Sequence, residues 1–405
     1  MSRPPRTALH SVLLYAHDTF GLGHLRRSLA IAGYLGERWP GLQTVLLTGS
    51  PVAERFAVGR GITLVRLPPV VKVGPNDYRP RDPAWSPGLV RRTRTAIMMD
   101  VASRLRPDVF LVDHAPQGMR GELLPVFAAL RSRSPATRIV LGLRDVVDDP
   151  QVVRRTWSDQ GVYDTLANVF DRILVYGSCE MLDVVEAYAI APATAAKLSY
   201  CGYLGRQRLH AVSGPAEAFV LGTAGGGGDG AEMLLAMLRA TRQLGLPALA
   251  VTGPLMDRVG REQLQAEAAT SASARVVEFA GEMIATMARA RVVVTMGGYN
   301  TLCELAAIGA SAVVVPRLHP RREQVIRAHL FEARGLVQVV EPGPDLVERL
   351  TAALASALVE HRPLGSPRID LHGLARTADA LECEAGLSRT ARWALAPVRP
   401  IRVPA

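Results

Sequence analysis

The amino-acid sequence predicts an α/β protein made of two Rossmann-like, doubly wound domains. Its 405 residues exceed the length over which one hydrophobic core usually keeps growing, which favours two domains. Short β-branched apolar runs alternate with longer stretches of helical periodicity, a pattern typical of βαβ units and a parallel sheet. Because this alternation occurs in both halves of the chain, we expect two such sheets.

The predicted strands are apolar runs of four to seven residues, each followed by turn residues or a helical pattern. In the first half they span 12–15, 44–47, 63–67, 109–113, 138–143 and 173–176. In the second half they span 218–221, 248–252, 275–279, 292–295 and 312–315. The two sets are similar in spacing, so the second half is expected to repeat the design of the first.

The best domain boundary lies between 201 and 215, where glycines, a proline and polar residues show no periodicity. We therefore expect an N-terminal domain over 1–208, a C-terminal domain over 216–385 and a proline-interrupted tail over 386–405. Ligands of doubly wound sheets bind outside the carboxyl ends of the strands. Two such domains facing each other across a cleft would hold a ligand from both sides.

Composition excludes several classes of function. Aromatic residues make up 5% of the chain, and the net charge of +10 comes from scattered arginines, so we expect no nucleic-acid partner. The four cysteines have no metal-ligand spacing and are expected to be reduced thiols. No apolar stretch approaches the roughly 20 residues of a membrane helix. The expected location is the cytoplasm, at most peripheral at the inner face of a membrane.

The loop after the first predicted strand contains residues that could bind an anion or act as a base. Gly21 and Gly23 allow a tight turn from strand to helix, and the helix N-terminus that follows attracts anions. His24 begins this helix, where an imidazole can remove a proton from a hydroxyl group. We interpret His24 as a candidate general base or acceptor-positioning residue. The alternative is a histidine that caps its own helix.

Two glycine-rich loops are predicted in the second half. In the first, Gly225, Gly226 and Gly227 strip side chains from a loop whose amides can surround a diphosphate. In the second, Gly297 and Gly298 open a turn after the strand 292–295. A floppy surface loop remains the alternative for the first of them.

The helix after the second glycine loop carries polar residues suited to a nucleotide. Asn300 or Thr301 is expected to cap it, which leaves the N-terminus free to meet phosphate. Glu304 lies one turn further on, where a carboxylate can accept hydrogen bonds from both ribose hydroxyls. The alternative for Glu304 is a glutamate that only complements the helix dipole.

A fourth segment, 315–328, has a strand end, a polar turn and a helix start. Glu323 and Gln324 supply groups suited to sugar hydroxyls. His319, Arg321 and Arg322 supply positive charge near phosphate. In the first half, Asp113, His114 and Asp145 fall at predicted strand ends, where they could bind an acceptor or assist as bases.

These segments resemble glycosyltransferase family 28. The run 297–316, followed by His319, Arg322, Glu323 and Gln324, is similar to the family's C-terminal domain. The N-terminal Gly-Leu-Gly-His24 matches the family's first glycine loop. The segment 277–283, with Phe279 and Met283, fits the stretch that packs on the donor base, and Arg206 sits where the family has an arginine near the donor.

The resemblance implies a GT-B fold and inversion at the anomeric carbon. It implies a nucleotide diphosphate-sugar donor, with UDP as the expected nucleotide, and no metal or other cofactor. The absence of an Asp-x-Asp motif agrees, since Asp148 and Asp149 are adjacent. The candidate catalytic residues are His24, which the resemblance supports, and Asp113 and His114, which are selected only from their positions at a predicted strand end. The implied donor-binding residues are Gly21, Gly23, Arg206, Gly225, Gly226, Gly227, Phe279, Met283, Gly297, Gly298, Asn300, Thr301, Glu304, His319, Glu323 and Gln324.

The sequence also departs from the family and leaves alternatives open. The family's paired glutamines are replaced by Glu323-Gln324, which leaves the sugar open between a hexose and an N-acetylhexosamine. A UDP-sugar 2-epimerase and a non-catalytic sugar-nucleotide-binding protein are the alternative functions. The acceptor is a lipid-linked sugar, a polysaccharide or a small metabolite. The basic, partly apolar stretch 85–99 could contact an anionic membrane or be a solvated helix with one core face.

Overall fold

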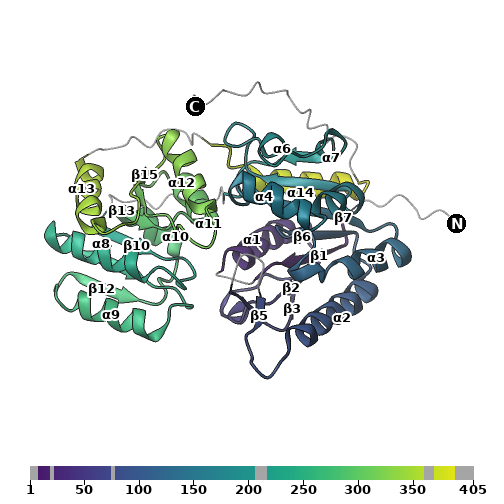
Figure 1. The fold of residues 1–405 in the computed structure, drawn as a ribbon, viewed down its shortest axis with the longest axis horizontal. Helices are drawn as coiled ribbons and strands as arrows, with labels where there is room; N and C mark the ends of the chain where they lie inside the picture. The colour runs from purple at the N-terminus through teal and green to yellow at the C-terminus, as the bar shows by residue number, and fades with distance from the viewer. Residues whose placement is uncertain (1–7, 19–21, 74–77, 206–216, 360–368, 388–405) are drawn as a thin grey trace. The chain divides into compact units, whose positions relative to one another are not determined.

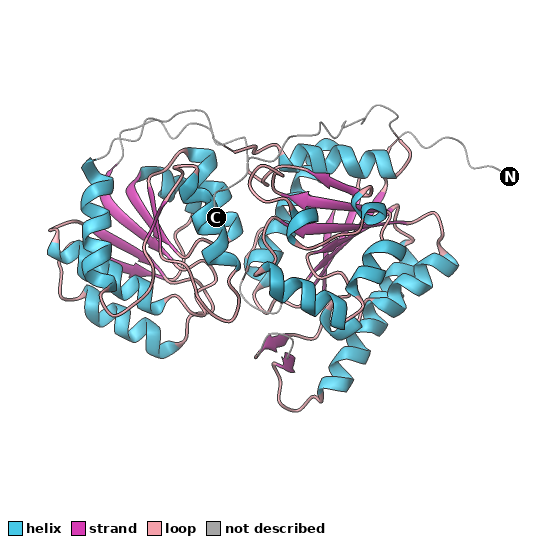
Figure 2. Ribbon diagram, turned by 45° about the horizontal axis from the view of Figure 1, so that its top comes forward, coloured by secondary structure: helices cyan, strands magenta, loops and turns pink. Residues whose placement is uncertain are grey.

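The computed structural model describes residues 8–18, 22–73, 78–205, 217–359 and 369–387. The chain divides into two compact units. Unit 1 comprises residues 1–20, 24–204 and 372–405, and unit 2 comprises residues 21–23 and 205–371. Each unit is an α/β structure with helices on both faces of a central sheet (Figures 1 and 2).

Unit 1 contains a parallel sheet of seven strands in the order β3-β2-β1-β6-β7-β8-β9. Its strands are β1 (Ser11–Ala16), β2 (Gln43–Thr48), β3 (Ile62–Arg66), β6 (Val109–Asp113), β7 (Arg138–Arg144), β8 (Arg172–Tyr176) and β9 (Leu198–Tyr200). Six of them confirm the predicted strands closely. The edge strand β9 has only three residues, too short a run to stand out in the sequence.

The helices of unit 1 connect these parallel strands. They are α1 (Gly23–Arg38), α2 (Pro87–Leu105), α3 (Leu124–Arg133), α4 (Pro150–Asp159), α5 (Val162–Asn168), α6 (Val184–Ala187), α7 (Pro192–Ala195) and α14 (Gly373–Glu384). A small antiparallel pair, β4 (Val70–Lys72) with β5 (Tyr78–Pro80), precedes α2. The central strand β1 is buried at every position, because both faces of the sheet are covered.

Unit 2 repeats the design with six parallel strands in the order β12-β11-β10-β13-β14-β15. They are β10 (Glu217–Thr223), β11 (Ala248–Val251), β12 (Ala274–Val277), β13 (Ala290–Thr295), β14 (Ala312–Val314) and β15 (Gln338–Val339). The helices are α8 (Ala231–Gln243), α9 (Arg258–Ala268), α10 (Met283–Arg289), α11 (Tyr299–Ile308), α12 (Glu323–Ala333) and α13 (Leu346–Val359). The five predicted strands of this half are confirmed.

Strand order reverses once in each sheet. In unit 1 the chain moves outward from β1 to β2 and β3, then returns to the other side of β1 with β6. In unit 2 the same reversal places β13 beside β10. Loops that follow the two central strands leave toward opposite faces of a doubly wound sheet, so a crevice for ligand opens between them. The predicted site segments follow these very strands.

The C-terminal helix corrects the expected domain limits. Residues up to 385 were expected in the C-terminal domain, yet α14 belongs to unit 1. Arg38 of α1 donates to Asp379 at 2.5 Å and to Glu382 at 2.8 Å, and Arg172 of β8 donates to Glu384 at 2.8 Å. The sequence pattern shows where the helix is but not which sheet it covers. The expected tail lies outside the described residues from 388 onward.

Close backbone contact at the start of α14 leads to a stability prediction. A Cβ atom on Gly373 would lie 2.6 Å from the carbonyl oxygen of Tyr203, so Gly373→Ala should force the helix away from unit 1. We expect a loss of about 1–3 kcal/mol in the free energy of unfolding, the usual cost of overpacking. Urea unfolding followed by circular dichroism measures it.

Gly33→Ala is the matched control, because this glycine lies inside α1 and its added Cβ would meet nothing within 4 Å. Alanine favours helix, so this variant should be as stable as the wild type or slightly more so. Equal stability of the two variants would contradict the proposed docking of α14.

Candidate functional site

A hydrogen-bonded cluster lies at the carboxyl end of β6 in unit 1. Asp113 ends this strand, and its Oδ2 atom lies 2.5 Å from His24 Nδ1 in the first turn of α1. Arg27, one turn further along α1, donates to both carboxylate oxygens at 2.7 and 2.8 Å. Arg27 Nη2 also lies 2.9 Å from His24 Nδ1, but the Asp113 carboxylate can only accept a hydrogen bond, so we assign the ring proton to Nδ1 and the basic lone pair to Nε2.

Burial decides the protonation of this cluster. It lowers the pKa of His24 to about 4; Asp113 opposes this effect, whereas Arg27 and Arg144 add to it. Burial alone would raise the pKa of Asp113, but Arg27 and His24 together hold it well below its ordinary value. Near pH 7 the cluster therefore contains a neutral imidazole and a charged carboxylate. The His24 side chain remains 14% exposed, so it is accessible to a substrate.

His114 joins the same cluster. It is buried, and its ring centroid lies 5.3 Å from that of His24. Arg144, at the end of β7, approaches His114 Nε2 at 3.1 Å. The backbone of His114 has φ = 66°, a left-handed conformation that is uncommon for residues other than glycine and is often found at functional sites. The structure thus brings together His24, Asp113 and His114.

Arg27 and Arg144 were missed by the sequence analysis. Arg27 lies three residues after His24 and therefore on the same face of α1, a spacing that could have indicated it. Arg144 directly precedes Asp145 at a strand end, the position for which Asp145 was selected. Asp145 itself is buried at 2% exposure.

A buried network fixes His17, which precedes the first loop. Arg94 and Glu122 form an ion pair with no exposure, and the Tyr15 hydroxyl donates to Glu122 at 2.7 Å. Because that hydroxyl proton goes to Glu122, His17 Nδ1–H must donate to the Tyr15 oxygen, at 3.1 Å. His17 Nε2 lies 3.3 Å from the Tyr78 hydroxyl. Both ring nitrogens of His17 are therefore held in this buried network beside the cluster.

Asp18 is a second carboxyl group at this edge of the sheet. It is 4% exposed, and the Thr48 hydroxyl donates to its Oδ2 atom at 2.5 Å. Burial raises the pKa of Asp18 to about 7, against the hydrogen bond from Thr48 and with the help of the nearby Asp113 charge. The two carboxyl groups therefore differ in character: Asp113 is an anion, and Asp18 titrates near neutrality.

In unit 2 the two glycine loops start side by side, because Thr223 of β10 pairs with Thr295 of β13. Gly227 has φ = 92°, and an added Cβ would lie 2.1 Å from the Thr252 carbonyl oxygen, so only glycine fits. Gly226 accepts a hydrogen bond from the Leu255 amide at 2.9 Å. The first loop is therefore held at defined points and is not a floppy surface loop.

The second loop opens α11. Gly297 has φ = 77°, and an added Cβ would lie 2.8 Å from a Val314 methyl group. The predicted caps are wrong: α11 begins at Tyr299 after Gly298, with no side-chain hydrogen bond at its N-cap. Asn300 and Thr301 lie inside the first turn, because the turn at Gly297 and Gly298 starts the helix earlier than expected. The first-turn amides therefore carry no side-chain cap.

The predicted base-binding and ribose-binding residues lie in the same unit. Phe279 follows β12 and is 45% exposed, unusual for a large apolar side chain. The Gly253 amide, in the loop after β11, donates to the Glu278 carbonyl at 3.1 Å, and Gly253 itself packs closely against Gly225 and Gly226 of the first glycine loop. Glu304 is half-buried in α11, and Met283 is half-buried at the start of α10.

An arginine that the sequence analysis missed joins the remaining segments. Arg317 follows β14 and donates to Asp229 of the first glycine loop at 3.0 Å and to Glu323 of α12 at 3.2 Å. Its backbone amide donates to Gln324 Oε1 at 3.1 Å. His319, two residues on, is exposed. Arg317 lies between the predicted run 297–316 and His319, but no local sequence pattern distinguished it from other arginines.

Two predicted residues, Gly21 and Arg206, lie outside the described residues. Gly23 is described as the first residue of α1. Within the described part of the chain, no three His, Cys, Asp or Glu side chains are grouped to hold a metal ion. In the same part, no helix is both long and apolar enough to cross a membrane.

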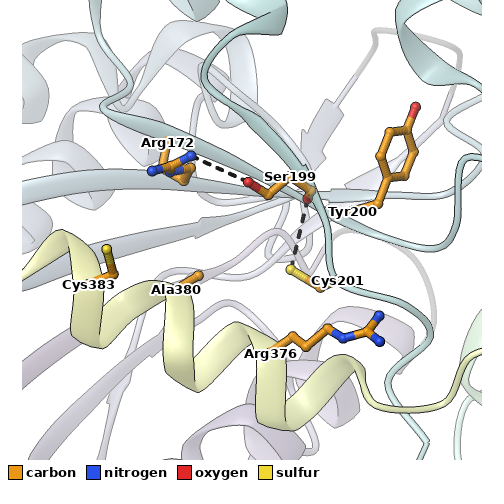
Figure 3. Close-up of a pocket in the computed structure, with 7 residues that line it drawn as sticks. All are labelled: Arg172, Ser199, Tyr200, Cys201, Arg376, Ala380 and Cys383. Atoms are coloured by element: carbon orange, nitrogen blue, oxygen red, sulfur yellow. Dashed lines mark hydrogen bonds between the residues drawn. The ribbon is translucent and has the colours of Figure 1, made fainter. Parts of the chain in front are cut away.

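A small cavity lies elsewhere in unit 1, between α14 and the strands β8 and β9 (Figure 3). Its volume is about 50 Å³, whereas ligand pockets usually measure about 300–1,000 Å³. Its lining contains none of the predicted site residues; it consists of Arg172, Ser199, Tyr200, Cys201, Arg376, Ala380 and Cys383. The candidate functional residues lie instead in the strand-end clusters.

Comparison with known proteins agrees with the C-terminal resemblance. Residues 231–362 match the model of the glycosyltransferase family 28 C-terminal domain. Over 125 residues the chain is 34% identical to the UDP-N-acetylglucosamine--N-acetylmuramyl-(pentapeptide) pyrophosphoryl-undecaprenol N-acetylglucosamine transferase of Sodalis glossinidius, covering 31% of this chain and 33% of that protein. The protein of the same name from Klebsiella pneumoniae is 33% identical over 153 residues, or 37% of this chain and 41% of that protein. The chain matches less than half the length of these relatives.

Solved structures resemble both units. The glycotransferase of kitacinnamycin gives a TM-score of 0.61 at 19% identity, covering 95% of this chain and 100% of that one. MurG of Acinetobacter baumannii gives 0.57 at 17% identity, covering 93% and 100%. A putative UDP-N-acetylglucosamine 2-epimerase from Listeria monocytogenes gives 0.61 at 13% identity, covering 98% and 100%. At such identities the likeness concerns the fold.

Residues 231–362 therefore match the glycosyltransferase family 28 C-terminal domain, in a chain that has the GT-B fold.

Proposed function

We propose that the protein is an inverting glycosyltransferase that moves a hexose or N-acetylhexosamine from a nucleotide diphosphate-sugar to an acceptor hydroxyl. One observation carries this proposal: two glycine loops lie side by side where the strand order of unit 2 reverses, the first directly before and the second inside the segment that matches family 28. Loops that are rich in glycine backbone, and a helix N-terminus whose N-cap makes no side-chain hydrogen bond, suit a diphosphate. The relatives are named for UDP-N-acetylglucosamine, which favours UDP as the nucleotide.

The donor would lie across the strand ends of unit 2. The diphosphate would contact Gly225, Gly226, Gly227, Gly297 and Gly298, with Asn300 and Thr301 in the first turn of α11. Glu304 would accept hydrogen bonds from the ribose hydroxyls, as acidic residues do in dinucleotide sites. The exposed Phe279, with Met283, would pack against the base. Glu323 and Gln324 would contact the sugar, and His319 would supply positive charge.

Transfer would begin when His24 Nε2 removes the proton of the acceptor hydroxyl as its oxygen attacks the anomeric carbon. Burial keeps the ring neutral down to about pH 4. The proton that the ring takes up is stabilised by Asp113, which is charged and hydrogen-bonded to Nδ1. The departing diphosphate takes the bonding electrons and is stabilised by loop amides and a helix dipole. We therefore propose that no metal cofactor is needed.

The acceptor would bind near His114 and Arg144, the other members of the unit 1 cluster. A lipid-linked sugar, a polysaccharide and a small metabolite remain candidates, and we propose a cytoplasmic location. The name of the relatives includes an undecaprenol-linked acceptor, which favours the first candidate.

A UDP-sugar 2-epimerase is the second candidate function, favoured by the fold it shares with one such protein. An epimerase would convert UDP-N-acetylglucosamine into its C2 epimer without any acceptor. A transferase needs both the nucleotide-sugar and an acceptor. Incubation of the protein with that nucleotide-sugar alone separates the two candidates.

The stretch 85–99 is a helix with one core face: α2 buries Val90, Arg94 and Met98, while Arg91 and Arg92 are exposed. Leu89 on its outer side is 41% exposed. We propose that this basic, partly apolar face contacts anionic lipid when the acceptor is lipid-linked.

Nucleotide binding is the first test of this function. Titration calorimetry with UDP, dTDP and GDP should show micromolar binding of one nucleotide, unchanged by EDTA. Glu304→Ala should weaken it at least tenfold by removing the ribose contact, whereas His24→Ala should bind normally and lose transfer. Equal loss of binding in both variants would contradict the assignment of nucleotide binding to Glu304 and of transfer to His24.

The pKa of Asp18 predicts a pH-dependent stability. The folded pKa of about 7 exceeds the unfolded value near 4, so stability is fully present below about pH 4 and is lost as pH rises toward 7. Asp18→Asn keeps the size of the side chain and removes the charge. Relative to the wild type it should gain stability between pH 4 and pH 8, by at most about 4 kcal/mol.

Chemical denaturation at several pH values measures this difference, and other titrating groups largely cancel between the two proteins. A difference that stays constant from pH 4 to pH 8 would show that Asp18 does not change its protonation in the folded protein over this range.

Lipid contact is tested by sedimentation with phosphatidylglycerol vesicles. Leu89→Asp should lower vesicle binding about tenfold, the effect expected from withdrawing one leucine from an apolar environment. Leu124→Asp is the matched control, because Leu124 is equally exposed at the start of α3. A similar reduction in both variants would contradict the assignment of the α2 face.

A further inference from the structure

Arg317 occupies a junction of unit 2 that no predicted role explains. It lies in the connection between β14 and α12, and its side chain is only 14% exposed. One guanidinium nitrogen donates to Asp229, in the first glycine loop, and another donates to Glu323 at the start of α12. Arg317 thereby joins the start of α12 to a loop residue that lies 88 positions before Arg317 in the chain.

The ion pair with Arg317 determines the hydrogen-bonding role of Glu323. This residue is 5% exposed, and a buried carboxylate is stable when a cation and hydrogen bonds compensate its charge. Arg317 supplies that cation at 3.2 Å. A carboxylate paired in this way accepts hydrogen bonds and donates none. Toward a sugar, Glu323 is an acceptor.

The same residue defines the orientation of Gln324. The Arg317 amide nitrogen is a donor, so the group that it meets at 3.1 Å must be the amide oxygen of Gln324. With the oxygen turned toward the backbone, the side chain presents its NH₂ group. Toward a sugar, Gln324 is a donor. A free amide would present either group.

We propose that Arg317 is a positioning residue of the donor-sugar subsite, which it makes selective for a neutral sugar with two neighbouring free hydroxyls. One hydroxyl donates to Glu323, and the other accepts from Gln324. A carboxylate on the sugar would be repelled by the negative charge of Glu323. This inference rests on the proposed function, because it assumes that these two residues face the donor sugar.

The test is calorimetric titration of the full chain with two probes, UDP and UDP-glucose. Their affinity ratio isolates the sugar contacts, because the nucleotide is common to both. The wild type should bind UDP-glucose about tenfold more tightly than UDP, the effect of two net hydrogen bonds. Arg317→Met should bring this ratio close to one and leave UDP affinity nearly unchanged.

Two further variants sharpen the test. Arg317→Lys keeps the charge but not the two-sided guanidinium geometry, so its ratio should be intermediate. Arg258→Met is the matched control, because Arg258 forms an exposed pair with Glu262 on α9 of the same unit. Its ratio should equal that of the wild type. Retained UDP binding shows that each variant is folded.

The outcomes separate this inference from the proposed function. A wild type that binds UDP, together with an Arg317→Met variant whose ratio is unchanged, would overturn the inference alone. Equal weakening of UDP and UDP-glucose would also overturn it, because Arg317 would then act on the glycine loop and the diphosphate. A wild type that binds no nucleotide would overturn the proposed function and the inference with it.

Discussion

The parallel pairing of β1 with β6, and of β10 with β13, is the constraint on which both candidate sites depend. Each pair stands where the order of strands reverses, so the connections that follow them leave toward opposite faces of the sheet. His24 and Asp113 meet across 89 residues of sequence because of the first pairing. The two glycine loops lie together because of the second. A different strand order with the same elements would separate these groups.

The two candidate sites differ in whether side chains or backbone groups form them. In unit 1 the cluster consists of side chains: a charged carboxylate, two arginines and two histidines whose charges and hydrogen bonds are interdependent. In unit 2 the loops consist largely of backbone, shaped by glycines such as Gly227 that approach other carbonyl groups closely. Backbone amides recognise any diphosphate, whereas a side-chain cluster can be adapted to one acceptor. This difference agrees with the detectable family match, which lies in unit 2.

Arg317 compensates the negative charge of the buried residue Glu323. The resemblance to family 28 implies that Glu323 stands in place of one of two paired glutamines, and this residue is buried. Such a charge costs stability unless a cation compensates it. Arg317 provides the compensation and also reaches Asp229 in the glycine loop. We infer that the glutamate and the arginine form one unit and should be exchanged together when related chains are compared.

Much of the fold and part of the sites could be predicted from the sequence. The apolar runs determined the strands, because burial on both faces of a parallel sheet requires them, and the glycines marked the loops after β1, β10 and β13. His24, Asp113 and His114 were identifiable since strand ends and helix starts in such sheets meet at one edge. The helix cap at Asn300 or Thr301 was wrong, because the turn at Gly297 starts α11 earlier than the capping pattern suggests.

Only the tertiary structure decided which side chains pair. Arg27 with Asp113, Arg144 with His114 and Arg317 with Asp229 are contacts between residues distant in the chain, and arginine side chains carry no local signal of their partner. The placement of α14 against unit 1 was undecided for the same reason, since an amphipathic pattern reports a buried face but not what covers it. Sequence thus determined the elements and the chemistry at their ends, and three-dimensional packing determined the charges, protonation and orientation that make these ends a site.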